Sequence, residues 1–230
     1  MEYAVFLIRP HQNNCSLRII SWNINGARTK LENIHVYNFL SNYDIISVNE
    51  AKTPFNISFP GYISYYSKSV TGAASLRGGT VVFVKNFLSG QIFNVVNNII
   101  DQVWLQVRCT PNIMYGFCYV PPADSQYFNH QSFVALREKM LDFKSNLKFC
   151  ILGDLNARFG SSVRNIPLRS STPDINKCTY PNIPDEVPSP NDNAYVLSSI
   201  CVDNDLVVLN NLKTATSHFQ SQKTFKKRNQ

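Results

Sequence analysis

The chain has 230 residues, enough for a single domain with a sizeable hydrophobic core. Hydrophobic residues make up 44% and charged residues 16% of the sequence, which excludes an intrinsically disordered protein. Lys and Arg outnumber Asp and Glu by 22 to 15, a formal net charge of +7. This balance favours polyanionic partners such as DNA or RNA, although many basic proteins bind no nucleic acid.

The six cysteines form no Cys-x-x-Cys pair, which argues against a zinc site. Cys109, Cys118 and Cys150 lie in apolar, strand-like runs, so we expect buried, reduced thiols in an intracellular protein. No apolar run is long enough to span a membrane, and Ala4–Ile8 is too short for a signal peptide, so no membrane partner is expected.

The first half of the chain reads mainly as strands. Met1–Ser16 has no clear period and is predicted to be a lead-in to one domain over residues 17–230. Leu17–Trp22 is predicted to be a strand, Lys30–Asn42 a helix and Tyr43–Val48 a buried strand. The further predicted strands have the spacing typical of a β-sandwich: Tyr62–Tyr66, Thr80–Val84, Ile92–Val96, Val103–Arg108 and Ile113–Val120.

The second half mixes helices, strands and a long loop. Gln126–Asn146 carries apolar residues three and four apart and is the strongest helix prediction. The other predicted elements are a strand Phe149–Leu152, a loop Ser161–Asn191, a helix Ala194–Val202 and a strand Leu206–Leu209. This order predicts an α+β fold, a two-sheet β-sandwich flanked by helices.

Polar side chains follow three of the predicted strands. Asn23 and Asn25 follow the first strand, Glu50 follows Tyr43–Val48, and Asp154 and Asn156 follow Phe149–Leu152. Singly, each group could form a turn or a solvated strand end. If the strands are neighbours, however, the groups converge at one end of the sandwich. Carboxylate and amide oxygens are ligands that Mg²⁺ prefers, so together these residues predict a metal site that could polarise a phosphate.

Four segments carry a family resemblance: Ser21–Gly26, Val48–Lys52, Tyr119–Pro122 and Gly153–Asn156. In this order they resemble the motifs of the endonuclease/exonuclease/phosphatase superfamily, and most closely the apurinic-type endonuclease domain of non-LTR, LINE-like retrotransposons. Asn25 supports this subgroup, because cellular abasic-site endonucleases usually carry Asp there. The resemblance extends over Leu17 to Thr224 and implies a DNase I-like, four-layer fold.

The resemblance also implies roles for individual residues. Glu50 would hold Mg²⁺, or Mn²⁺ in its place, with Asn25 nearby. Asp154 would orient or deprotonate the attacking water, and Asn156 would position that water or the phosphate. Asn23 would organise the site by hydrogen bonds. The remaining catalytic residue is Tyr119, whose hydroxyl would lie near the scissile phosphate unless it is simply a core aromatic with its hydroxyl at the rim.

Three further residues are candidates for binding the substrate. Thr224 resembles a family Thr that contacts the DNA backbone. Arg158 lies close enough to the Asp154 motif to reach a substrate anion, and Arg77 could contact a phosphate. Either arginine could instead be a solvated loop residue.

Family members end with a late Asp and a Ser-Asp-His segment, which the sequence does not reach by Gln230. None of His11, His35, His130 and His218 has the family context. The expectation is therefore a C-terminally truncated domain that lacks its last strands and has weakened activity, since positioned acid–base groups contribute on the order of 10² to 10⁴ in rate.

Three functions fit these residues. The leading prediction is a Mg²⁺-dependent phosphodiesterase that nicks DNA, in an intracellular, nuclear protein with no obligate protein partner. One alternative is a phosphatase of the same superfamily acting on inositol phosphates, because the segment Gly153–Arg158 resembles that group as well. The other is an inactive remnant that only binds nucleic acid through its basic surface.

Overall fold

The computed structural model describes residues 3–8, 16–53, 57–67, 78–125, 131–143, 147–158, 189–204 and 206. Two compact units are present. Unit 1 comprises the described residues of Met1–Val120 and Glu138–Asp154, and unit 2 those of Pro121–Arg137 and Leu155–Gln220. The predicted strand Leu206–Leu209 and nearly all of the predicted loop Ser161–Asn191 lie outside the described residues.

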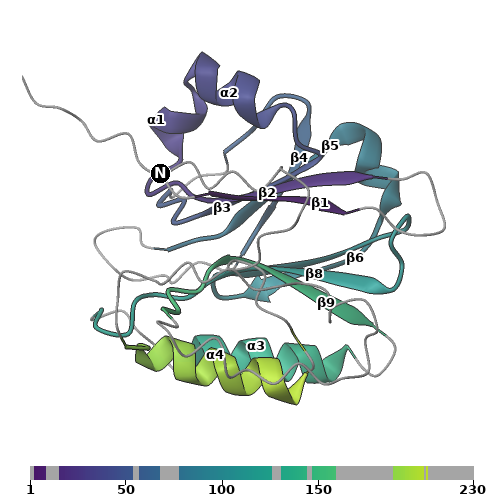
Figure 1. The fold of residues 1–230 in the computed structure, drawn as a ribbon. Helices are drawn as coiled ribbons and strands as arrows, with labels where there is room; N and C mark the ends of the chain where they lie inside the picture. The colour runs from purple at the N-terminus through teal and green to yellow at the C-terminus, as the bar shows by residue number, and fades with distance from the viewer. Residues whose placement is uncertain are drawn as a thin grey trace, which may run out of the picture. The chain divides into compact units, whose positions relative to one another are not determined.

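The first sheet of unit 1 has five strands in the order β1-β2-β3-β5-β4 (Figure 1). Its strands β2 and β3 run parallel, and the other neighbouring pairs are antiparallel. The strands are β1 (Tyr3–Ile8), β2 (Leu17–Asn23), β3 (Ile45–Asn49), β4 (Tyr62–Tyr66) and β5 (Val81–Lys85).

The second sheet of unit 1 has four strands in the order β6-β7-β8-β9. Its last pair, β8 and β9, is parallel, and the others are antiparallel. The strands are β6 (Ile92–Ile99), β7 (Gln102–Val107), β8 (Ile113–Tyr119) and β9 (Lys148–Asp154). Two mixed sheets with flanking helices confirm the predicted α+β sandwich.

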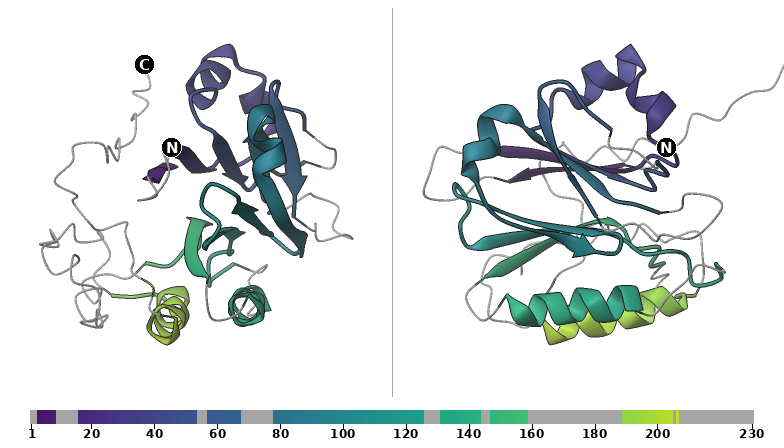
Figure 2. Two further views of the ribbon diagram at one scale, coloured as in Figure 1. Left: turned by 90° about the vertical axis from the view of Figure 1, so that its right-hand side faces the viewer. Right: turned by 180° about the vertical axis from the view of Figure 1, so that it is seen from behind.

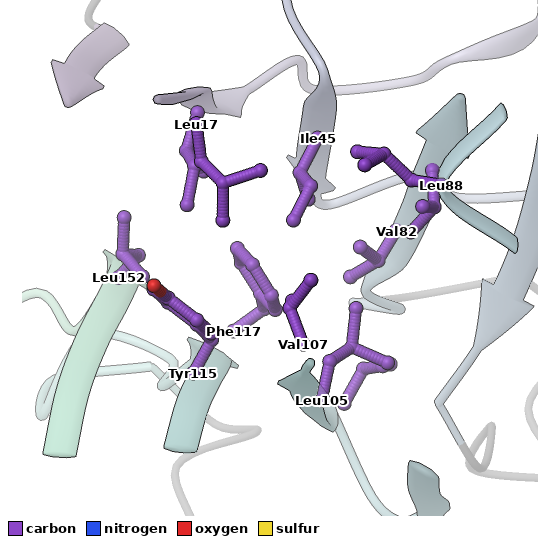
Figure 3. Packing of buried hydrophobic residues seen from close by; sticks show 12 residues of the cluster. Leu17, Ile45, Val82, Leu88, Leu105, Val107, Tyr115, Phe117 and Leu152 are labelled. Carbon is purple, nitrogen blue, oxygen red and sulfur yellow. The ribbon is translucent and has the colours of Figure 1, made fainter. Parts of the chain in front are cut away.

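The core of unit 1 lies between the two sheets, whose side chains point toward one another (Figure 3). Alternate residues of a strand face opposite sides. In β2, Leu17 and Ile19 therefore join this core, whereas Ile20 and Trp22 join a second cluster on the opposite face of the first sheet. The same alternation in β3 and β5 leaves the three middle strands of the first sheet largely buried on both faces.

The buried side chain of Asn49 forms hydrogen bonds with residues of both sheets. Its Oδ1 accepts a hydrogen bond from Ser21 Oγ at 3.4 Å. Its Nδ2 donates to Thr80 Oγ1 at 3.1 Å and to the Cys118 carbonyl at 3.4 Å. Both sheets are thus linked through one fully buried amide.

Two short helices, α1 (Arg28–Leu31) and α2 (Ile34–Leu40), cover the outer face of the first sheet (Figure 2). The prediction of one helix over Lys30–Asn42 is wrong, because Asn33 interrupts it. Asn33 is extended, with φ −74° and ψ 124°, and its side chain accepts hydrogen bonds from the backbone N–H groups of His35 and Val36. A residue that caps a new helix in this way cannot continue the preceding one.

The two longer helices are α3 (Gln131–Asp142) and α4 (Asp192–Asp203). Helix α3 lies within the predicted Gln126–Asn146, and its apolar stripe is buried at Phe133, Leu136 and Met140 as expected. In unit 1 the segment after α3 packs on the second sheet, with the rings of Phe143 and Trp104 5.6 Å apart.

The strand β1 lies in the segment predicted to be a lead-in. Six residues are too few to reveal a period, and β1 is fixed by antiparallel pairing with β2. A 3-10 helix, η1 (Asn86–Gln91), connects β5 to β6. Within the described residues, no helix is long and apolar enough to cross a membrane.

The described cysteines all carry free thiols. Cys118 is buried, as predicted, but Cys109 and Cys150 are only half-buried. The difference arises because an apolar run in sequence does not reveal how completely its neighbours cover each face.

Candidate active site

Polar residues meet where four strands of unit 1 end. Asn23 is the last residue of β2 and is paired with Asn49, so that Glu50 follows directly on the neighbouring parallel strand. Tyr119 ends β8 and is paired with Asp154, the last residue of the parallel strand β9. Parallel neighbours end at the same edge of a sheet, which explains why residues so distant in sequence converge.

The Asn23 side chain joins the two carboxylates of this cluster. Its Nδ2 donates to Glu50 Oε1 at 2.9 Å and to Asp154 Oδ2 at 2.7 Å. Its Oδ1 accepts from the backbone N–H of Asn25 at 3.2 Å, which fixes the orientation of the amide. One neutral side chain thus uses both of its amide protons to hold two acidic groups together.

The ammonium of Lys52 bridges Glu50 and Asn25. Its Nζ lies 2.8 Å from Glu50 Oε2 and 2.6 Å from Asn25 Oδ1. Burial raises the pKa of the Glu50 carboxyl, but the hydrogen bonds from Lys52 and Asn23 and the Lys52 charge outweigh it, so that the pKa lies below its ordinary value. Glu50 is therefore ionised at neutral pH.

This arrangement suits a metal cation. The oxygens of Glu50 and Asn25 already share one positive charge, that of Lys52, and a carboxylate and an amide oxygen are hard ligands suited to Mg²⁺. Within the described ranges, no group of three His, Cys, Asp or Glu side chains that could hold a metal ion together is present. A metal held here would depend on few protein ligands, as Mg²⁺ sites commonly do.

The hydroxyl of Tyr119 donates a hydrogen bond to the Glu50 carboxylate. Tyr119 is buried, with 7% of its surface exposed. Burial, the negative charge of Glu50, its hydrogen bond to that carboxylate, and the charges of Asp154 and Asp101 all raise the pKa of Tyr119. The phenol is therefore neutral at physiological pH and can donate a hydrogen bond.

Among the described residues, five other than glycine have positive φ, and three of these five belong to this cluster. Their φ angles are 47° for Asn25, 52° for Glu50, 47° for Lys52, 56° for Asp101 and 47° for Asn156. Such conformations are unfavourable for L-residues and persist where the surroundings impose them. Residues in such conformations cluster at active sites and ligand-binding sites, so their presence here indicates a functional site.

Asp101, in the turn between β6 and β7, was not predicted from sequence. Its Oδ1 accepts from the Gly79 N–H at 2.6 Å, and its carbonyl accepts from the Tyr119 N–H at 3.0 Å and from Thr80 Oγ1 at 2.9 Å. Gly78 and Gly79 in turn accept from Lys52 and Ala51. Asp101 therefore stabilises Gly78 and Gly79, whose carbonyls accept hydrogen bonds from the two residues that follow Glu50.

Burial raises the pKa of Asp101 to about 6, with the Glu50 charge acting in the same direction and the Gly79 N–H opposing it. The native state thus binds this proton more tightly than the unfolded chain does. We expect the free energy of unfolding to fall by up to about 3 kcal/mol as the pH rises through the range from the ordinary Asp pKa to about 6.

The variant Asp101→Asn should lose this pH dependence, because its amide oxygen can still accept from Gly79. Urea unfolding from pH 4 to pH 8 with a chelator present measures the effect. Identical pH profiles of wild type and variant would contradict the assignment.

Asn156 and Arg158 belong to unit 2. Here they line a cavity of about 330 Å³. Its other lining residues are Pro122, Ala123, Asp124, Asn191 and Asp192. Arg77, Thr224 and three of the four histidines lie outside the described residues, and His35 is exposed on α2.

Sequence reasoning missed Lys52, Asp101 and the asparagines at the start of α4. Asn191 directly before a helix is an N-cap signal that could have been noticed. Asp101 is an isolated acid between the apolar runs of β6 and β7, a position that reads as an ordinary turn. The roles predicted for the remaining site residues stay predictions.

Comparison with known proteins gives a family and a distant structural likeness. No curated protein matches the chain by sequence. Among solved structures, the chain is similar to an AP endonuclease from Archaeoglobus fulgidus, with a TM-score of 0.45 and 19% identity, over 67% of this chain and 61% of that one. The model of the Endonuclease/Exonuclease/phosphatase family matches residues 20–208. Because this match spans most of the sequence, including Asn23, Glu50, Tyr119 and Asp154, the chain belongs to the endonuclease/exonuclease/phosphatase family of hydrolases.

Proposed function

We propose that the chain is a Mg²⁺-dependent phosphodiesterase that nicks DNA in the nucleus, of the kind found in LINE-like retrotransposons. One observation carries the proposal: a single amide, that of Asn23, holds the carboxylates of Glu50 and Asp154 at one strand edge. Two carboxyl groups kept together beside a cation are suited to metal-assisted attack on a phosphodiester. Asn25, in place of Asp, supports the retrotransposon subgroup.

Glu50 and Asn25 would hold the metal, with Mn²⁺ able to replace Mg²⁺. The metal would neutralise charge on the scissile phosphate. Asp154, oriented by Asn23, would accept the proton of the attacking water. Tyr119, neutral because its pKa is raised by burial and by the Glu50 charge, would turn its hydroxyl from Glu50 to donate a hydrogen bond to a phosphate oxygen.

The residues of unit 2 would bind the rest of the substrate. Asn156 would position the water or the phosphate. Arg158, exposed at the rim of its cavity, would pair with a neighbouring DNA phosphate, as would Arg77 and Thr224. The formal charge of +7 would draw DNA toward the protein and make binding sensitive to salt.

Plasmid nicking tests the proposal. We expect the purified chain to convert supercoiled plasmid to the open circle with Mg²⁺ and to lose this activity in EDTA. In Glu50→Gln, the Mg²⁺ concentration for half-maximal rate should rise more than tenfold, because perturbing even an outer-shell partner costs 10- to 100-fold in affinity. Full activity in EDTA, or an unchanged metal requirement in Glu50→Gln, would refute it.

The same preparation separates the two alternatives. Release of free phosphate from inositol phosphates without plasmid nicking would indicate a phosphatase. DNA binding that weakens steeply with salt, without turnover of any substrate, would indicate a binding remnant.

A further inference from the structure

The residue that caps α4 forms hydrogen bonds with the backbone segment that follows β9. Asn191 Oδ1 accepts from the Arg158 N–H at 3.0 Å, and its Nδ2 donates to the Asn156 carbonyl at 2.8 Å. The Asn191 N–H also donates to the Arg158 carbonyl at 3.0 Å. Three hydrogen bonds from one residue therefore fix the segment that contains Asn156.

The same Asn191 side chain caps the helix. Its Oδ1 also accepts from the Ala194 N–H at 3.0 Å, the bond expected of an N-cap residue. The amide oxygen of Asn191 thus accepts from both the helix and Arg158, whereas its nitrogen donates, among the described residues, only to Asn156. The donor group contributes nothing to the helix itself.

Asn193, two residues on, holds the preceding residue and a second segment. Its Nδ2 donates to the Leu155 carbonyl at 3.1 Å and to the Pro121 carbonyl at 3.0 Å. Asn193 is fully buried, yet its Oδ1 has no hydrogen-bond partner among the described residues. Burying an amide whose oxygen lacks a hydrogen-bond partner is unfavourable. An apolar residue would pack α4 without this penalty, so packing alone does not explain Asn193.

Asn156 needs such support. Its φ of 47° lies in the left-handed region, which Asn adopts more readily than most residues, and neighbouring hydrogen bonds hold it there. Asn191 and Asn193 supply hydrogen bonds to the backbone of Leu155, Asn156 and Arg158. They hold the Asn156 backbone, and hence the direction of its side chain, without touching that side chain.

We propose that Asn191 is a positioning residue for Asn156, with Asn193 as its support, so that the first turn of α4 sets the geometry of phosphodiester cleavage. The inference rests on the proposed function. Asn191 touches no reacting atom; its Nδ2–H bond to the Asn156 carbonyl is the contact through which it acts.

Asn191→Asp isolates that contact. Aspartate keeps the oxygen that accepts from Ala194 and Arg158, and it is as good an N-cap as asparagine. It loses the donor to Asn156 and sets a carboxylate oxygen against that carbonyl. We expect kcat for plasmid nicking to fall by on the order of 10²-fold, the effect of a small misplacement, with KM little changed. The melting temperature should fall less than in Asn191→Ala, because the helix cap is kept.

Asn33→Ala is the matched control, because Asn33 caps α2 by the same type of bond and makes no contact with Asn156. This variant should lower the melting temperature while kcat is retained. Asn191→Ala should lower both. Comparing these variants separates the effect of losing a helix cap from the effect of misplacing Asn156.

The outcomes are distinguishable. If the wild type nicks DNA and Asn191→Asp matches it in kcat, the positioning role is wrong while the proposed function stands. A fall in kcat that merely follows the melting temperature, and that Asn33→Ala reproduces, would also overturn the role. A wild-type chain without metal-dependent nicking would overturn the proposed function, and the role of Asn191 with it.

Discussion

Replacing Gly153 by alanine should abolish the fold, the largest stability effect expected in this chain. A Cβ at this position would lie 1.8 Å from the Cys118 carbonyl oxygen and 2.8 Å from its carbonyl carbon. Both atoms belong to backbone in the paired strand β8, so neither can move aside. The φ of 138° adds strain. We expect a loss of more than about 4 kcal/mol, seen as insoluble protein or a greatly lowered urea midpoint.

Alanine variants of two other glycines separate the effect of the steric clash from the effect of backbone strain. Gly61 has a φ of 82° but open space around its Cβ position, so Gly61→Ala should cost only about 1 to 2 kcal/mol of backbone strain. Gly90 has open space and no positive φ, and Gly90→Ala should be close to neutral. A soluble Gly153→Ala with a midpoint near that of Gly61→Ala would show that β8 and β9 are not paired in this register.

The largest effect on catalysis is expected from Asp154→Asn. The amide is nearly the same size as the carboxylate, and its oxygen can still accept the hydrogen bond from Asn23. The change therefore removes the proposed proton acceptor and leaves the packing intact. We expect the nicking rate to fall by on the order of 10² to 10⁴, the contribution of a positioned proton acceptor. The melting temperature and the Mg²⁺ requirement should change little.

Asp142→Asn provides the control, because Asp142 is a largely exposed carboxylate at the end of α3 that pairs only with Lys139 among the described side chains. It should retain the full rate. Unchanged nicking in Asp154→Asn would remove Asp154 from the mechanism. A large rise in the Mg²⁺ requirement would instead make it a metal ligand.

The strands and the convergence of their ends were within reach of the sequence. A buried strand is predicted from a short apolar run, and the polar residue that follows the run marks the end of the strand. Asn23, Glu50 and Asp154 were found in this way. Their shared hydrogen bonds depend on which strands are neighbours, which comes from the parallel pairing of β2 with β3.

Other features depend on contacts that no local pattern records. The apolar spacing that suggested one helix over Lys30–Asn42 was correct for the buried face, but the capping bonds of Asn33 divided it. Asp101 acts through Gly79, twenty-two residues earlier, and such a bond leaves no periodic signal. Lys52 was seen only as the neighbour of Glu50, although its ammonium joins two candidate ligands.

The burial of β2, β3 and β5 on both faces has a consequence for how these strands find their alignment. In a strand with one apolar face, a slip by one residue exposes that face to water and is strongly disfavoured. Strands β2, β3 and β5 are apolar on both faces, so a slip would exchange one core for the other at little hydrophobic cost. The buried Asn49 breaks this degeneracy. Only in the native alignment do Ser21, Thr80 and the Cys118 carbonyl meet its amide, and any slip would leave that amide buried and unpaired. A single polar side chain thus selects one alignment, and with it the one that brings Asn23 level with Glu50.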